Sequence, residues 1–300
     1  MEDTAVSLDE ALSTYIDETL SAKNASPLTR RAYERDLAEL VDFLTEHGHL
    51  TQPQQVSLFH LERFLATLDE KGLSGNYRRR KAAAIRSFFA FCYKRGYVQT
   101  NPSLELVPPA REEKEPRFLT EPEYKRLMET VRFQVRDAAL IEILLQTGVR
   151  LSEIARLRLQ DVQLPRRISP DPENAGMITV FGKRRKGRNI TLNWKACEAL
   201  KRYLDKRPDV PYPEIFITKF GKPMGPRSVE NVVSKYLEQA GIAGATVHTM
   251  RHTFATSHVR NKTSLKVIQA ALGHANLATT SRYVGLVAEE MNKQLQEHAL

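Results

Sequence analysis

The segment NPSLELVPPAREEKEPRF, residues 101–118, holds four prolines and a cluster of charged side chains. Proline fixes φ and lacks a backbone donor, so such a stretch continues neither a helix nor a sheet. It therefore predicts a boundary between two domains. A chain of 300 residues is long enough to form a hydrophobic core on either side of it. We assign residues 1–105 to an N-terminal domain, residues 106–118 to a linker and residues 119–300 to a C-terminal domain.

Helical patterns fill the N-terminal domain. The stretch VSLDEALSTYIDETL has apolar residues at helical spacing, and Ser26 followed by Pro27 is typical of a helix N-terminus. We expect that second helix to end near Gly48, and two more helices at residues 58–68 and 75–94. Four helices of this size predict a small bundle.

The C-terminal domain is predicted to be mostly helical with a small antiparallel sheet. Thr120 precedes its first helix, and the nearly all-apolar DAALIEILLQTG predicts a central, buried helix. Short β signals at residues 177–181 and 188–192, joined by a basic turn, predict a hairpin. The remaining helices are expected at residues 195–206, 227–240, 249–261, 264–272, 276–284 and 287–298.

Composition indicates where the protein acts and what it binds. A net charge of +9 favours a polyanionic partner, and both domains are basic once the acidic residues 1–22 are set aside. Solubility alone also explains a moderate charge. With two cysteines, no secretory signal pattern and no long apolar run, the chain is expected to be intracellular, in the cytoplasm.

Two basic motifs of the C-terminal domain are candidate phosphate ligands. Arg150 follows Gly148 where a new helix begins, and a guanidinium beside a helix N-terminus suits a phosphate. The alternative is an ion pair between Arg150 and Glu153, one turn on. The hairpin turn carries five basic residues; it is either a solvated turn or one that brings a lysine to a nucleic-acid backbone: Lys183, Arg184, Arg185, Lys186 and Arg188.

The sequence HTMRH places His248 and Arg251 three residues apart, on one face of a helix. His252 points another way and is either a core histidine or a hydrogen-bonded support.

Tyr283 lies in the polar stretch of LGHANLATTSRYVGL. At about 100° per residue, Ser281 and Val284 fall on the side of the apolar Leu277. Tyr283 falls roughly 120° away, alongside Asn276, Thr279 and Thr280. This phase predicts that Tyr283 occupies a polar face, as a reactive hydroxyl would.

Arginine, lysine, His-x-x-Arg, Gly-His and tyrosine follow one another in the motifs TGVRLSEI, GK, HTMRHTFAT and LGHANLATTSRYV. In this order and spacing they resemble the tyrosine recombinase (phage integrase) family, and most closely its bacterial Xer-like site-specific recombinases. The resemblance covers nearly the whole chain. It implies an N-terminal four-helix core-binding domain of the SAM-like type and a mixed, mostly helical catalytic domain.

The resemblance implies that Tyr283 attacks a DNA phosphodiester, giving a 3′-phosphotyrosine link and a free 5′-hydroxyl. A tyrosine hydroxyl has a pKa of about 10, so it needs a proton acceptor or a cationic site. His248 is the expected acid/base, because imidazole titrates near neutral pH. Arg150 and Arg251 are expected to clamp the non-bridging oxygens.

Two further catalytic roles follow from the resemblance. Lys183 is expected to protonate the departing 5′-oxygen, with Lys186 on the same turn as the alternative, and His274 is expected to donate a hydrogen bond to the phosphate. The protein link conserves the bond energy, so no ATP is required. No cluster at metal-ligand spacing is evident in the sequence, and we expect neither a metal nor another cofactor.

The N-terminal bundle is expected to close on the other side of the DNA through its second and fourth helices. A solvated basic face explains any single arginine of this set equally well. The candidate DNA contacts are Thr29, Arg31, Arg35, Arg79, Arg80, Lys81 and Arg86, with Lys186 from the C-terminal domain.

The implied partners are double-stranded recombination sites and other protomers. Related recombinases form a tetramer on two sites through a C-terminal helix, as a homo- or hetero-tetramer, with an accessory protein in some systems. The role is expected to be chromosome or plasmid dimer resolution, with integration of a mobile element as the alternative. A DNA-binding relative that has lost its chemistry and a type IB topoisomerase are the other readings.

Overall fold

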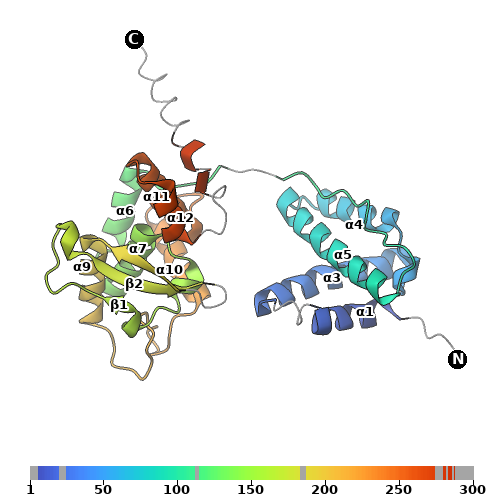
Figure 1. Cartoon of the computed structure of the whole chain (residues 1–300), viewed down its shortest axis with the longest axis horizontal. Coiled ribbons are helices and arrows are strands. Elements are labelled where there is room, and N and C mark those ends of the chain that lie inside the picture. Colours follow the sequence, from blue (N-terminus) through green and yellow to red (C-terminus); the bar gives the residue numbers. More distant parts are fainter. Residues whose placement is uncertain are drawn as a thin grey trace, which may run out of the picture. The chain divides into compact units, whose positions relative to one another are not determined.

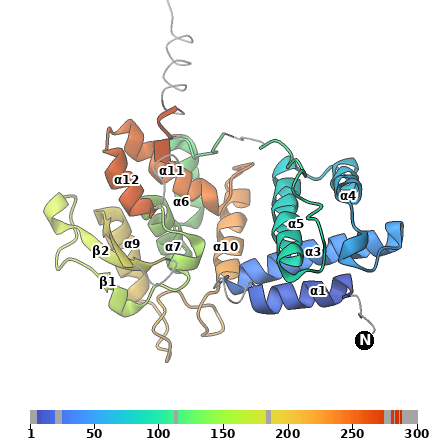
Figure 2. The ribbon, with the colours of Figure 1, turned by 45° about the vertical axis from the view of Figure 1, so that its right-hand side comes forward.

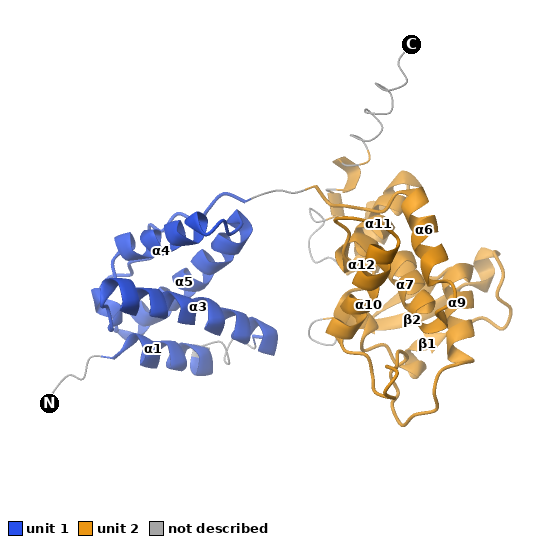
Figure 3. Ribbon diagram, turned by 180° about the vertical axis from the view of Figure 1, so that it is seen from behind, with its two compact units in different colours: residues 1–114 blue, residues 115–300 orange. Residues whose placement is uncertain are grey.

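The computed structural model of the protein describes residues 6–19, 25–111, 115–182, 187–273, 280–281, 283–285 and 287. The chain divides into two compact units, residues 1–114 and 115–300 (Figure 3). Each unit has a hydrophobic core of its own.

The secondary structure of the described part of the N-terminal unit consists of helices (Figure 1). Its long second helix begins where the sequence predicts, because the Ser26 hydroxyl accepts a hydrogen bond from the Thr29 N–H at 3.1 Å and Pro27 takes the first helical position. The four expected helices are confirmed, and the first continues into a π-helical turn. The elements are α1 (Leu8–Thr14), η1 (Tyr15–Thr19), α3 (Pro27–Gly48), η2 (Pro53–Gln55), α4 (Leu58–Glu70) and α5 (Gly75–Arg95).

Part of the segment predicted as a linker packs on the N-terminal unit. Leu106 is fully buried in its core. Arg86 donates a hydrogen bond to the Leu106 carbonyl, and Arg79 donates one to the Pro109 carbonyl at 3.0 Å. Residues 106–109 are therefore held against α5.

The C-terminal unit combines helices with a small sheet. Its elements are α6 (Glu121–Val131), α7 (Val135–Thr147), α8 (Leu151–Ile154), η3 (Leu159–Asp161), β1 (Val162–Gln163), η4 (Pro172–Asn174), β2 (Gly176–Phe181), β3 (Gly187–Leu192), α9 (Trp194–Leu204), α10 (Pro226–Gln239), α11 (Val247–Arg260) and α12 (Leu265–Leu272).

Helix α7 is the centre of this unit, as its apolar sequence predicts (Figure 2). It packs against α6, α9 and α11 and against strand β3. It ends at Gly148, whose φ of +59° is a left-handed conformation that glycine adopts without strain. The reversal at Gly148 leads directly into α8 and sets the position of Arg150.

The predicted hairpin is confirmed as β2 and β3, which pair antiparallel with Val180 opposite Arg188. The sheet also contains β1, so its order is β1-β2-β3. Sequence periodicity does not predict β1, because a strand of two residues has no alternation to read.

The predicted fold class, mainly helical with a small antiparallel sheet, is confirmed. Residues 280, 281, 283–285 and 287 are helical, whereas the rest of the helices expected at 276–284 and 287–298 lies outside the described residues. No helix in the described ranges is both long and apolar enough to cross a membrane.

Candidate active site

Arg150 sits at the N-terminus of α8 and reaches two elements. The Glu153 carboxylate accepts the Arg150 backbone N–H at 2.8 Å and its Nη1 at 3.0 Å, so the predicted Arg150–Glu153 pair is present. Nη2 donates to the carbonyl of Gly273, just after α12, at 2.8 Å. The side chain remains 42% exposed, which leaves the guanidinium accessible to a phosphate.

Arg251, on α11, is more deeply placed and only 8% exposed. It donates to the carbonyls of Gly148 at 2.5 Å and Leu272 at 2.7 Å. Burial lowers its pKa to about 10, and the nearby charge of Arg150 acts in the same direction. The group is still protonated at neutral pH. His248, one turn earlier on α11, is exposed.

Three consecutive carbonyls at the end of α12 are each held by a different arginine. Ala271 accepts from Arg188 Nε at 2.8 Å, Leu272 from Arg251 and Gly273 from Arg150. The last carbonyls of a helix lack partners within it and carry its negative dipole end, so cations bind there favourably. The contacts fix the end of α12 to both arginines that the sequence singles out.

Glu153 is the shared counter-ion of this cluster. It is almost fully buried and accepts a bidentate pair from Arg188, with both N···O distances at 2.8 Å. Burial acts to raise the pKa of Glu153, but the hydrogen bonds from Arg188 and from the Arg150 backbone outweigh it and hold the pKa below its usual value.

Tyr283 is buried, with 2% of its surface exposed, in a small hydrophobic cluster. Its hydroxyl oxygen lies 2.8 Å from Nδ1 of His252 in a hydrogen bond. His252 is therefore the hydrogen-bonded support that the sequence left as one of two options. The other buried members of the cluster are Phe254, Ala255, Ile268 and Leu272.

The prediction that Tyr283 occupies a polar face, away from the apolar residues, was wrong, because its side chain is buried in a hydrophobic cluster. Helical phase correctly groups Tyr283 with Thr280 and Ser281 with Val284, whereas Asn276 and Thr279 lie outside the described residues. The side that faces inward is the one with Thr280 and Tyr283, which are both buried, whereas Ser281 and Val284 are exposed. The reason is the large apolar ring of Tyr283, which gains more from burial against α11 and α12 than a single valine does, while His252 satisfies its hydroxyl.

Three predicted catalytic residues, Lys183, Lys186 and His274, lie outside the described residues.

Arg188, on the same hairpin, is described, and it is neither solvated nor directed to the surface. The alternation of β3 places it on the face of Ile190 and Leu192, both buried, and this period of two was the signal for its inward position.

Lys81 was expected to contact DNA, and the structure corrects this. Its side chain is fully buried between Asp36, at 3.4 Å, and Glu39. A buried ammonium needs paired carboxylates, and Lys81 uses its charge to join α5 to α3. Arg80 is also paired with Asp36 but is partly exposed.

The remaining N-terminal candidates lie at or near the surface. Arg31 and Arg35 are exposed on α3, one turn apart. Arg79 and Arg86 are exposed as well, although each also donates to a carbonyl of residues 106–109. The Thr29 hydroxyl is engaged with Ser26 at the helix start.

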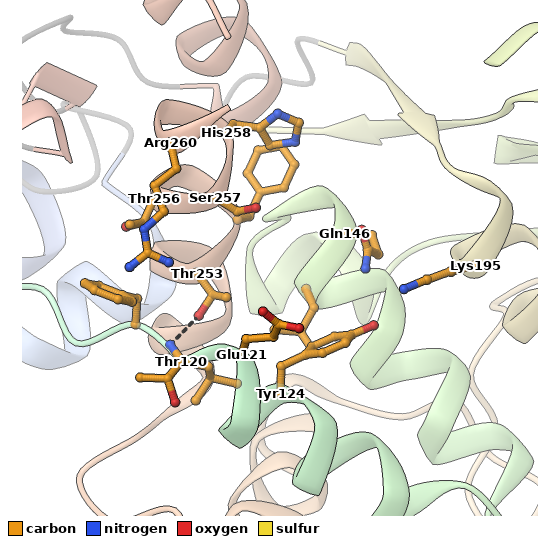
Figure 4. Close-up of a pocket in the computed structure, with 14 residues that line it drawn as sticks. Thr120, Glu121, Tyr124, Gln146, Lys195, Thr253, Thr256, Ser257, His258 and Arg260 are labelled. Carbon is orange, nitrogen blue, oxygen red and sulfur yellow. Dashed lines mark hydrogen bonds between the residues drawn. The ribbon is translucent and has the colours of Figure 1, made fainter. Parts of the chain in front are cut away.

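A cavity of about 310 Å³ opens between α6, α7 and α11 (Figure 4). The Leu119 N–H donates to Thr253 Oγ1 at 2.8 Å on its wall, and Tyr124 donates to the buried Glu142 at 3.2 Å. Burial raises the pKa of Glu142 and of Tyr124. The described residues that line this cavity do not include Arg150, Arg251 or Tyr283, so it is separate from the arginine cluster.

Comparison with known proteins accounts for both units. Residues 12–96 match the phage integrase N-terminal SAM-like domain, and residues 117–290 match the phage integrase family. The chain belongs to the phage integrase family. It is a tyrosine recombinase of the Xer-like kind, as its sequence motifs predict.

Named relatives of this phage integrase match nearly the whole chain. The tyrosine recombinase XerC of Halalkalibacterium halodurans is 31% identical over 305 residues, covering 97% of each chain. Among solved structures, a XerA recombinase is 27% identical over 97% of this chain and 99% of its own, with a TM-score of 0.53. A XerH recombinase bound to a palindromic difH substrate shares the fold with a TM-score of 0.76 at 22% identity, covering 97% of this chain and 85% of its own.

Proposed function

We propose that the chain cleaves and rejoins double-stranded DNA at specific sites, with Tyr283 as the nucleophile. The observation that carries this proposal is the fixed cluster of Arg150 and Arg251 on the end of α12, in the unit that also holds Tyr283. Two guanidinium groups supported from behind by backbone carbonyls and a carboxylate are a preorganised site for a phosphodiester.

In the proposed reaction the Tyr283 oxygen bonds to phosphorus while the bond to the 5′-oxygen breaks. The tyrosine proton passes to a base, with His248 proposed, and the 5′-oxygen leaves as a hydroxyl after taking a proton from Lys183. Arg150 and Arg251 stabilise the charge on the non-bridging oxygens. Rejoining reverses these steps, with a 5′-hydroxyl attacking the phosphotyrosine link, so no external energy source enters.

In the structure, the Tyr283 hydroxyl is hydrogen bonded to His252. Attack on DNA requires that hydroxyl to reach phosphorus, so we propose that the His252 partner is exchanged for the substrate on the way to cleavage. His274, beside Gly273, is proposed as a donor to the same phosphate, which accords with the contact between the Gly273 carbonyl and Arg150.

We propose a Xer-like role in the cytoplasm, namely resolution of chromosome or plasmid dimers, by a homo- or hetero-tetramer joined through the C-terminal segment. The XerC names of relatives that match 87% or more of this chain favour this over integration of a mobile element. Solved relatives include a lambda integrase dimer on a core site and a tetramer on a Holliday junction, which support an assembly on DNA.

A covalent-complex assay tests the proposal. A binding-site selection first supplies the target, and a duplex containing it is nicked near the cleavage point so that the intermediate accumulates. We expect a protein–DNA adduct on a denaturing gel for the wild type and for Tyr212→Phe, an exposed tyrosine control. Tyr283→Phe should give none.

Two outcomes of this assay contradict the proposal. Absence of an adduct with the wild type would support a catalytically silent DNA-binding protein, and an adduct with Tyr283→Phe would assign the nucleophile elsewhere.

Relaxation of a supercoiled plasmid that lacks the site would indicate a topoisomerase instead. EDTA in each reaction tests metal independence, and we expect unchanged yields.

A further inference from the structure

Arg188 is the third arginine of the cluster, and the structure aims it inward. It lies at the start of β3, with its side chain 15% exposed. Nη1 and Nη2 each donate to one oxygen of Glu153 at 2.8 Å, and Nε donates to the Ala271 carbonyl at 2.8 Å. One planar group thus joins the hairpin, α8 and the end of α12.

The contact with α12 extends to Gly273. A Cβ on Gly273 would lie 3.0 Å from Arg188 Nη1 and 3.1 Å from its Cζ, closer than side-chain carbons normally approach. The φ of Gly273 is +62°, which also favours glycine. A glycine at this position therefore suits the backbone turn that precedes His274, and a larger residue would shift the Arg188 guanidinium by a few tenths of an ångström.

Arg188 also sets the charge available at the site. Arg150 shares Glu153 Oε1 with Arg188, at 3.0 Å and 2.8 Å. Without Arg188, the buried carboxylate would offset the charge of Arg150 alone. With it, three guanidinium groups and one carboxylate keep two positive charges, whereas Arg150, Arg251 and Glu153 without Arg188 would keep one, and the higher charge suits the transition state of a phosphodiester better.

We propose that Arg188 is a positioning residue for strand cleavage, which holds Glu153, and through it Arg150, and fixes the Gly273 turn against the site. This inference rests on the proposed strand cleavage by this unit. Arg188 acts through other residues and does not itself contact the phosphate. A lysine cannot replace it, because one ammonium cannot make a bidentate contact with Glu153 and also reach Ala271 in a fixed plane.

The test measures cleavage and binding separately for Arg188→Gln and Arg188→Lys on the selected nicked duplex. We expect the rate of adduct formation to fall roughly 10- to 100-fold for both variants, since misplaced groups slow chemistry by about this much. The Kd for the DNA should stay within roughly threefold, and the slope of log K against log salt should not change. Arg202→Gln, an exposed arginine on α9, serves as the matched control and should keep the wild-type rate.

A double-mutant cycle identifies the route. If Arg188 acts through Glu153, the variant with both Arg188→Gln and Glu153→Gln should lose less than the product of the two single losses. Multiplicative losses would overturn the proposal. So would a lysine variant with the wild-type rate, since a positive charge alone would then be enough. A salt slope that reports one phosphate fewer would also overturn it, since Arg188 would then bind DNA directly.

Folding and chemistry are kept apart by controls. Thermal unfolding of each full-length variant shows whether it is folded at the assay temperature, and if the glutamine variant is not, the lysine variant carries the test. A wild type that forms no adduct contradicts the proposed function itself. A wild type that does, beside an unaffected Arg188→Gln, contradicts only the role of Arg188.

Discussion

The hydroxyl of Tyr283 and Nδ1 of His252 lie 2.8 Å apart, inside a cluster that leaves 2% of the tyrosine exposed. The proposed nucleophile is thus stored among apolar side chains with its reactive atom hydrogen bonded to α11. This hydrogen bond stabilises the buried position of the hydroxyl. We therefore expect that breaking it contributes to the free energy required for cleavage.

The first prediction concerns this hydrogen bond. We expect His252→Phe to lower the free energy of unfolding of the C-terminal unit by about 0.5–1.5 kcal/mol, because the hydrogen bond between His252 and the buried Tyr283 hydroxyl is lost. Urea unfolding of the full chain, followed by circular dichroism, measures the change.

Tyr283→Phe is the matched variant, and the double variant completes a cycle. The sum of the two single losses of unfolding free energy should exceed the loss of the double variant, because the double variant loses the same hydrogen bond only once. Additive losses would show that the two side chains do not depend on each other, and the stored state would then need another explanation.

The second prediction concerns Arg251. Its guanidinium holds the Gly148 and Leu272 carbonyls together while it faces the site. A lysine keeps the charge but cannot span both carbonyls, so we expect Arg251→Lys to lower the rate of adduct formation by about 100-fold or more. Single-turnover kinetics on the nicked duplex measure the rate, and a variant within tenfold of the wild type would contradict this role.

Much of the fold could be predicted from the sequence. Ser26 with Pro27 and Thr120 with Glu123 give local capping signals, and the observed helices begin there. The apolar run of α7 predicts a buried helix whatever surrounds it. Such features depend on neighbours in the sequence, and they could be read without knowledge of tertiary contacts.

The errors occur where tertiary contacts decide. Helical phase groups Thr280 with Tyr283 but carries no information about which side meets α11, and polar side chains alone suggested the wrong side. Lys81 was predicted to contact DNA like its arginine neighbours. The sequence did not reveal its ion pairs, because their carboxylates lie on another helix, α3. Arg188 was grouped with a basic turn, although its partners Glu153 and Ala271 are distant in sequence.

The third prediction is a pH dependence of stability from Glu153. Its pKa is lowered in the folded state, so its contribution to stability is fully present above the unfolded pKa of about 4.3 and is lost as pH falls through the folded value. We expect the wild type and Glu153→Gln to differ most in unfolding free energy at neutral pH. The difference should narrow below about pH 4.3.

Acid also protonates other carboxylates, which lowers the stability of both proteins. The measured quantity is therefore the difference in unfolding free energy between the wild type and Glu153→Gln. The same substitution at Glu230, an exposed residue of α10, controls for the loss of one surface charge. A difference at Glu153 that stays constant from pH 7 down to about 3 would contradict the lowered pKa.

The fourth prediction separates two kinds of basic residue in the N-terminal unit. Arg31 and Arg35 are exposed on α3, whereas Lys81 is buried between Asp36 and Glu39. Replacing both arginines by alanine should weaken binding to DNA and make the slope of log K against log salt shallower by about 0.9 for each phosphate that is no longer neutralised. Unchanged slopes would assign the two arginines to a solvated face.

Lys81→Met should behave in the opposite way. It leaves the buried Asp36 carboxylate with one partner fewer, so we expect the N-terminal unit to lose about 3 kcal/mol of unfolding free energy. At a temperature where the variant is still folded, its salt slope should equal that of the wild type, because Lys81 has no surface from which to reach a phosphate. A shallower slope with unchanged stability would show that Lys81 leaves its ion pairs to bind DNA.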